Sequence, residues 1–143
     1  MKKKHTLLYT LLSTLFIISA LSCGGDDDPT AQDLAFENLS GSWDLGQGGA
    51  IIIDGQDASA NFVGFAFSFT DGGYTTTNAG DLFRATGTWE WTDEAAQQLS
   101  IDDGKTITIV ELTETRFVFS FTTNGVGGAA NGIAGNYTIT VNQ

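Results

Sequence analysis

Alternation of large apolar residues with small or polar ones constrains this chain more than any other feature of its sequence. In FVGFAFSFT, residues 62–70, a large apolar side chain occupies every second position from Val63 onward, and RFVFSFT, residues 116–122, has the same pattern. Successive side chains of a β-strand point to opposite faces of a sheet. Each segment is therefore predicted to be a strand with one aromatic face. These faces hold Phe65, Phe67, Phe69, Phe117, Phe119 and Phe121.

Further short segments of this kind are separated by turns rich in glycine and aspartate. They include GSWDL (41–45), AIIID (50–54), YTTTN (74–78), RATGTWEWT (84–92), TITIVELT (106–113) and NYTITV (136–141). Only residues 32–39 suggest a helical turn. A meander of short strands protects its edges by closing or by forming two layers. We therefore predict an all-β fold, an antiparallel up-and-down β-barrel of about eight strands or a flattened sandwich.

One predicted strand breaks its own alternation. In TITIVELT, Ile107 and Ile109 share a face, whereas Val110 and Leu112 fall on the opposite face. A β-bulge adds one residue to a strand and so shifts the phase of the side chains. The sequence predicts such a bulge near Ile109–Val110.

The start of the chain is typical of a secretory signal peptide. Three lysines precede an apolar run from Leu7 to Leu21, which ends in small residues. This run is shorter than the roughly 20 residues that a spanning helix needs. We expect residues 1–22 to be removed, the alternative being a retained anchor.

Cys23, the single cysteine of the chain, follows this run directly. In an exported protein a lone cysteine pairs outside the chain, stays free or is modified. ALSC, residues 20–23, resembles the lipobox of bacterial lipoproteins, although Ala20 stands where that motif usually has leucine. The resemblance implies that Cys23 is lipidated and that its lipid attaches the protein to a membrane.

The acidic segment GGDDDP, residues 24–29, is typical of a solvated tether. CGGDDD also resembles the export signal of Bacteroidota surface lipoproteins. This implies that Asp26, Asp27 and Asp28 direct the protein to the outside of the outer membrane, with the periplasmic leaflet as the alternative. The expected organisation is a signal peptide over 1–22, a lipidated tether and lead-in over 23–38, and one β-barrel domain over 39–143.

Several short motifs lie along this domain: LSGSWDL at 39–45, a second Gly-x-Trp at 87–89, Leu-Thr-x-x-x-Phe-x-Phe at 112–119 and YTITV at 137–141. Together they resemble the lipocalin-like domains of small Bacteroidota lipoproteins. The resemblance implies an eight-stranded up-and-down barrel or flattened sandwich. That family has no general activity, so it implies no catalytic residue.

Charge and composition exclude several functions. Beyond residue 22 the chain holds all 17 acidic residues but only Arg84, Lys105 and Arg116 as basic ones. Such a surface disfavours nucleic-acid binding. The only histidine, His5, lies in the predicted signal peptide, so sites that need an imidazole are excluded. We predict no enzyme, no catalytic residue, no metal and no cofactor.

Carboxylates leave two further candidates. Glu90, between two tryptophans, is a single acid of the type used in glycoside hydrolysis, or else a solvent-facing residue. Asp54, Asp57 and Asn61 place oxygen ligands for calcium in one loop, although their spacing does not match an EF-hand.

The aromatic residues have two interpretations. They are the six phenylalanines above with Trp43, Trp89 and Trp91. Either they line a cavity for a small apolar ligand or a glycan, or they fill the core of a small barrel. The corresponding functions are an anchored binding domain, which takes such a ligand or an envelope protein, and a structural surface lipoprotein with a solid barrel.

Overall fold

The computed structural model describes residues 28–101, 104–125 and 133–143. The predicted signal peptide, the lipidation site Cys23, and Asp26 and Asp27 of the export signal lie outside these residues. The elements are α2 (Ala31–Leu39), β1 (Gly41–Asp44), β2 (Ala50–Ile53), β3 (Gln56–Asp57), the 3-10 helix η1 (Ser59–Phe62), β4 (Ala66–Thr70), β5 (Gly73–Thr77), β6 (Thr86–Trp91), β7 (Gln98–Ile101), β8 (Thr106–Leu112), β9 (Arg116–Thr123) and β10 (Gly135–Asn142). Across the described ranges, no helix combines the length and apolar character needed to cross a bilayer.

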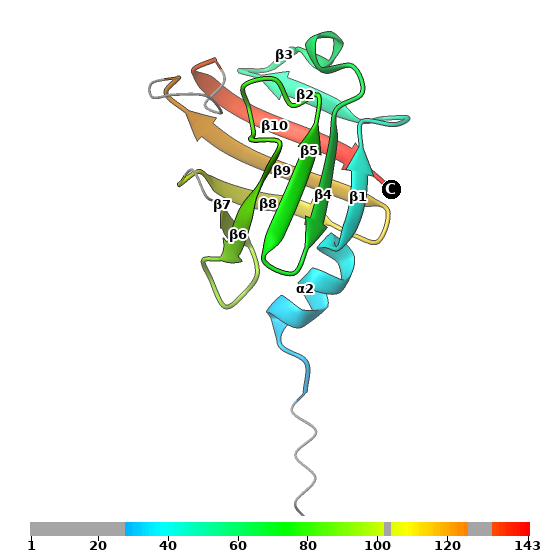
Figure 1. Cartoon of the computed structure of the whole chain (residues 1–143), viewed down its shortest axis with the longest axis vertical. Helices are drawn as coiled ribbons and strands as arrows, with labels where there is room; N and C mark the ends of the chain where they lie inside the picture. Colours follow the sequence, from blue (N-terminus) through cyan, green and yellow to red (C-terminus); the bar gives the residue numbers. More distant parts are fainter. Residues whose placement is uncertain (1–27, 102–103, 126–132) are drawn as a thin grey trace, which may run out of the picture.

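Eight strands close into an antiparallel barrel (Figure 1). Their order is β1-β4-β5-β6-β7-β8-β9-β10, and β10 returns to β1 where Asn142 lies opposite Asp44. From β4 to β10 each strand pairs with the next one in the sequence, as expected when short turns join neighbours. The predicted all-β, up-and-down barrel is confirmed.

The first strand of the barrel is interrupted, which the sequence did not lead us to expect. Asp44 lies opposite Asn142 and Ala50 lies opposite Thr140, so β1 and β2 follow one another along β10. The residues between them, 45–49, loop out. On its other side β1 pairs with β4, whereas β2 pairs with the two-residue β3. The barrel wall is therefore incomplete beside β2, and η1 contacts β2 there.

The bulge predicted near Ile109–Val110 is confirmed in β8. Ile109 lies opposite Phe119 and Glu111 lies opposite Val118, so Val110 is an extra residue on β8. Val110 is 63% exposed. After it, Leu112 again packs against the core. The bulge thus keeps the apolar residues on both sides of it inside the barrel.

Aromatic rings fill the barrel interior. The six phenylalanines predicted to share the inner faces are between 0% and 5% exposed: Phe65, Phe67, Phe69, Phe117, Phe119 and Phe121. Phe67 stacks on Phe69 with 4.3 Å between ring centroids, and Phe117 stacks on Phe119 at 4.7 Å. Phe67 also meets Phe119 edge-on at 6.1 Å. Because the rings contact one another across the barrel, they form its core.

Helix α2 closes one end of the barrel (Figure 1). Its N-terminus is fixed by a capping box between Thr30 and Asp33, and it ends at Leu39, which is fully buried. The indole N–H of Trp43 donates to the carbonyl of Leu39 at 2.9 Å. We call the end of the barrel that α2 closes the tether end, because the described chain enters the barrel there from residue 28. The opposite end is the mouth.

Candidate functional site

An apolar pocket opens at the mouth. It has a volume of about 290 Å³ and is lined by Ile53, Asn61, Phe62, Asp81, Leu82, Ile133 and Tyr137. Five of these seven residues are apolar or aromatic, and the two polar ones, Asn61 and Asp81, are exposed. We call it the mouth pocket. Its size is at the lower limit of cavities that take small molecules.

Tyr137 forms the rigid wall of the mouth pocket. Its ring is almost parallel to that of Phe121, with centroids 4.8 Å apart. Its hydroxyl donates to the carbonyl of Ile133 at 2.7 Å. Burial raises the pKa of this hydroxyl above its ordinary value, so it stays neutral at physiological pH. The wall thus offers an apolar face without a charge.

The loop between β5 and β6, residues 78–85, forms the floor of the mouth pocket. Leu82 and Phe83 are nearly fully buried, and the Phe83 ring lies 4.9 Å from that of Phe67 and 5.4 Å from that of Phe121. Asn78 donates to the carbonyls of Val63 and Gly64, which joins the loop to the segment before β4. We call residues 78–85 the plug, since they fill the end of the barrel opposite α2.

Lys105 secures the plug, a role that sequence reasoning missed. Its ammonium donates to the carbonyl of Leu82 and lies 4.6 Å from the centroid of Phe83 and 5.1 Å from that of Phe121. A cation over aromatic faces is stabilised by the ring quadrupoles. Only 8% of this lysine is exposed. In the sequence it follows the turn DDG, where nothing distinguishes it from a solvated lysine.

The predicted cavity-lining aromatics are not in the mouth pocket. Phe65, Phe67, Phe69, Phe117 and Phe119 line none of four pockets on the described residues, whereas Phe121 lines one of them, together with Lys105 and Tyr137. The tryptophans of β6 lie near the tether end instead. Trp89 is 7% exposed and packs on Phe36 of α2, and Trp91 is half-buried.

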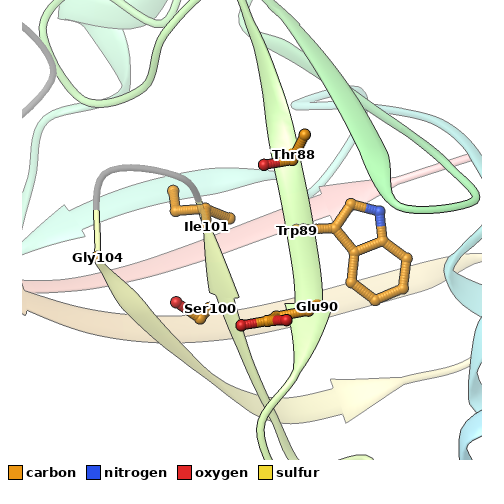
Figure 2. Close-up of a pocket in the computed structure, with 6 residues that line it drawn as sticks. All are labelled: Thr88, Trp89, Glu90, Ser100, Ile101 and Gly104. Carbon is orange, nitrogen blue, oxygen red and sulfur yellow. The ribbon is translucent and has the colours of Figure 1, made fainter.

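Glu90 lies on the outer face of the barrel. Figure 2 shows Glu90 and Thr88 pointing away from the side of β6 that carries Trp89. Glu90 is exposed and lies opposite Ser100 of β7. Among the described residues, the pocket drawn there is lined by no second acid that could pair with Glu90 as in a glycosidase. Asp102 and Asp103, which follow Ile101 in the sequence, lie outside the described residues.

The predicted calcium ligands make structural hydrogen bonds. Asp54 accepts from the backbone N–H and the side-chain amide of Asn136, both at 2.9 Å, and Asp57 accepts from the backbone N–H and hydroxyl of Ser59. These bonds lower the pKa of both carboxyls. Within the described part of the chain, no three or more His, Cys, Asp and Glu side chains lie so as to hold a metal ion. Asn61 lines the mouth pocket instead.

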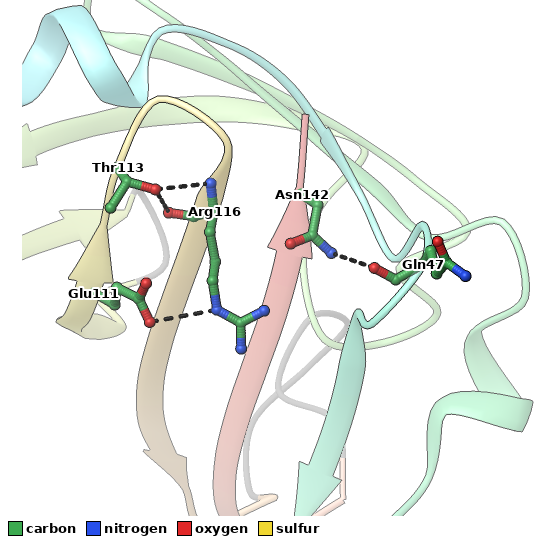
Figure 3. Close-up of polar contacts among 5 residues, drawn as sticks. All are labelled: Gln47, Glu111, Thr113, Arg116 and Asn142. Carbon is green, nitrogen blue, oxygen red and sulfur yellow. Dashed lines mark hydrogen bonds and ion pairs between the residues drawn. The ribbon is translucent and has the colours of Figure 1, made fainter.

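Two polar contacts involve Arg116 at the start of β9 and Asn142 at the end of β10, which lie opposite each other (Figure 3). The Arg116 guanidinium pairs with Glu111 at 3.3 Å, and Asn142 donates to the carbonyl of Gln47 at 3.4 Å. Both side chains of this ion pair are exposed, so the pair contributes little to the stability of the fold. The amide contact joins the looped-out residues 45–49 to β10. Both contacts are structural.

Comparisons with protein-family models, with curated proteins and with solved structures gave no match. The functional assignment therefore depends on the site itself.

Proposed function

We propose that this chain is a lipid-anchored protein of the bacterial outer membrane, facing the cell exterior, that binds a small apolar ligand at the mouth of its barrel. The observation that carries the proposal is the mouth pocket, with apolar walls and two polar residues at its rim. Burial of apolar ligand surface against such walls contributes roughly 25 cal/mol per Å². Because aromatic side chains pack the interior, we place the apolar ligand at the mouth rather than inside the barrel.

The position of the pocket fits an anchored protein. The chain enters the barrel at α2, and the mouth pocket lies at the other end (Figure 1). A lipid on Cys23 would attach the protein beyond the α2 side. The mouth would then be at the end of the barrel farther from the point of attachment. The resemblances to the lipobox, to the acidic export signal and to lipocalin-like domains support the same assignment.

Binding of ANS, a dye with an aromatic apolar part and one sulfonate, to the full chain in lipid nanodiscs tests the pocket. We expect one saturable site per chain above the lipid background, displaced by apolar compounds. Ile133→Trp should abolish it, because a larger side chain at the rim fills the pocket. Val63→Trp is the matched control: Val63 is 76% exposed, close to Ile133 at 74%, but does not line the pocket. Equal dye binding by both variants and the wild type would contradict the proposal.

A second function, a structural surface lipoprotein, is favoured by one observation, the packed aromatic core. A solid barrel serves as a rigid support whose loops contact other envelope proteins. In that case the wild-type chain should show no saturable dye binding. The same titration therefore distinguishes the two functions.

The anchor is tested separately. Cys23→Ala should abolish incorporation of labelled palmitate and release the protein from membranes. Continued membrane attachment of this variant would indicate that the apolar run is retained.

Replacing Asp26–Asp28 by alanine should preserve lipidation but remove access to protease added to whole cells. A wild-type chain shielded from that protease, while other surface proteins are cut, would place it on the periplasmic leaflet.

A further inference from the structure

A second pocket lies at the tether end, between α2, the β4–β5 turn and β6. Its volume is about 380 Å³, and it is lined by Gln32, Asp33, Phe36, Asp71, Gly72, Trp89, Glu90 and Trp91. We call it the tether-end pocket. None of its residues lines the mouth pocket, so the two sites are separate.

Three aromatic rings form one side of the tether-end pocket. Trp89 and Trp91 are nearly perpendicular, at 86°, with ring centroids 5.1 Å apart, and Phe36 lies 5.8 Å from Trp89. Trp91 and Phe36 are only half-buried, so part of each side chain is accessible. Trp89 is 7% exposed, so the rings that a ligand can reach are mainly those of Trp91 and Phe36.

Carboxylates form the other side. Asp33 on α2 and Asp71 in the β4–β5 turn are exposed, and none of the eight lining residues is basic. Hydrogen bonds from the hydroxyl and backbone N–H of Thr30 lower the pKa of Asp33, which is therefore ionised at neutral pH. Glu90 is a third acidic residue among those that line the pocket.

The walls are fixed without a ligand. The indole N–H of Trp89 donates to the carbonyls of Thr70 at 2.8 Å and Gly73 at 3.1 Å, which holds the turn that carries Asp71. The side-chain amide of Gln32 donates to the carbonyl of Asp93 at 2.8 Å, which holds the first turn of α2 against the β6–β7 loop. Binding therefore does not have to order these elements, which favours affinity.

We propose that the tether-end pocket binds a small organic ammonium ion. An ammonium is attracted to the faces of tryptophan and phenylalanine rings within about 6 Å and to nearby carboxylates. An anion would be repelled by Asp33 and Asp71. A neutral apolar ligand would remove water from these carboxylates without compensating their charge. The aromatic and acidic walls together thus select an organic cation.

Equilibrium dialysis of labelled choline against the full chain in a non-ionic maltoside detergent tests this site. We expect saturable binding that weakens as salt is added, since salt screens exposed charges. Dimethylbutanol, the uncharged isostere of choline, should bind about tenfold more weakly or worse. Absence of saturable choline binding, or equal binding of the two compounds, would overturn the proposal.

Variants assign the binding to the pocket. Asp71→Asn changes only the charge of an exposed turn residue, so the fold should be unaffected, and Trp91→Leu removes one aromatic face. Each should weaken choline binding about tenfold. Thr88→Val is the matched control, on β6 beside Trp89 but outside this pocket. Unchanged binding in Asp71→Asn, or an equal loss in Thr88→Val, would overturn the assignment. Loss of dye binding at the mouth by Ile133→Trp should leave choline binding unchanged.

Discussion

The ammonium of Lys105 donates a hydrogen bond to the carbonyl oxygen of Leu82, joining the start of β8 to the plug. The two residues are 23 positions apart in the sequence. The same ammonium lies over the ring of Phe83. The order of the plug therefore depends on a buried cation, in a chain with few basic residues.

The first prediction concerns this contact. Lys105→Ala should lower the free energy of unfolding by about 1–3 kcal/mol, because a hydrogen bond from a charged donor is lost and the Leu82 carbonyl is left without it. Lys105→Met keeps most of the apolar stem and should cost less. Amide hydrogen exchange across residues 79–83 should become faster in both. Unchanged exchange in Lys105→Ala would show that the plug is held by other contacts.

The second prediction concerns the aromatic core. Phe67→Ala and Phe119→Ala should each cost roughly 3–5 kcal/mol in urea unfolding, the range for aromatic core truncations. Both side chains are fully buried, and their rings meet edge-on. A double-mutant cycle should give a coupling of about 0.5–1.5 kcal/mol. Losses under about 1 kcal/mol at both positions would mean that the rings do not fill a packed core.

The third prediction concerns the bulge. Deleting Val110 should preserve the barrel, because Ile109 and Leu112 then keep their partners in a regular ladder. Deleting Ser120 of β9 is the control: it makes Phe119 and Phe121 adjacent, so one of them must face water. Thermal unfolding should show a small shift for the first deletion and a large loss for the second. Similar losses in both would contradict the role given to Val110.

The fourth prediction is a dependence on pH. Hydrogen bonds from Asn136 lower the pKa of Asp54 below its ordinary value of 3.8. A depressed pKa in the folded state adds stability above the unfolded value, and this stability is lost as the pH falls through the folded value. The urea concentration at the midpoint of unfolding should therefore decrease as the pH is lowered from about 5 to about 2. In Asp54→Asn this midpoint should decrease less steeply than in the wild type, and in Asn136→Ala the steepness should be intermediate. An equally steep fall in Asp54→Asn would exclude this pair as a source.

Local periodicity explains what the sequence could predict of the fold. The phenylalanines of β9 alternate strictly, so their common face follows from strand geometry alone. The bulge was visible because Val110 and Leu112 leave the phase of Ile107. Residues 32–39 were expected to be helical, and α2 begins one residue earlier, at Ala31. Each of these features is encoded within a few neighbouring residues.

The parts that were not predicted depend on contacts between distant segments. Leu82 and Phe83 stand in a short connection between strands, and Phe83 is buried through contacts with the distant residues Phe67 and Phe121. Lys105 is buried because that plug covers it. The tether-end pocket requires Phe36 of α2 beside Trp89 of β6, a proximity that no local pattern encodes.

Methyl NMR of the full chain in nanodiscs, titrated with ANS, tests the proposed ligand site most directly. If the ligand binds at the mouth, the methyl signals of Ile53, Leu82 and Ile133 should shift in proportion to occupancy. Those of Leu99 and Ile139, which are fully buried and line none of the four pockets, should not. Shifts confined to Leu99 and Ile139, or the absence of any saturable shift, would contradict a binding site at the mouth of a solid barrel.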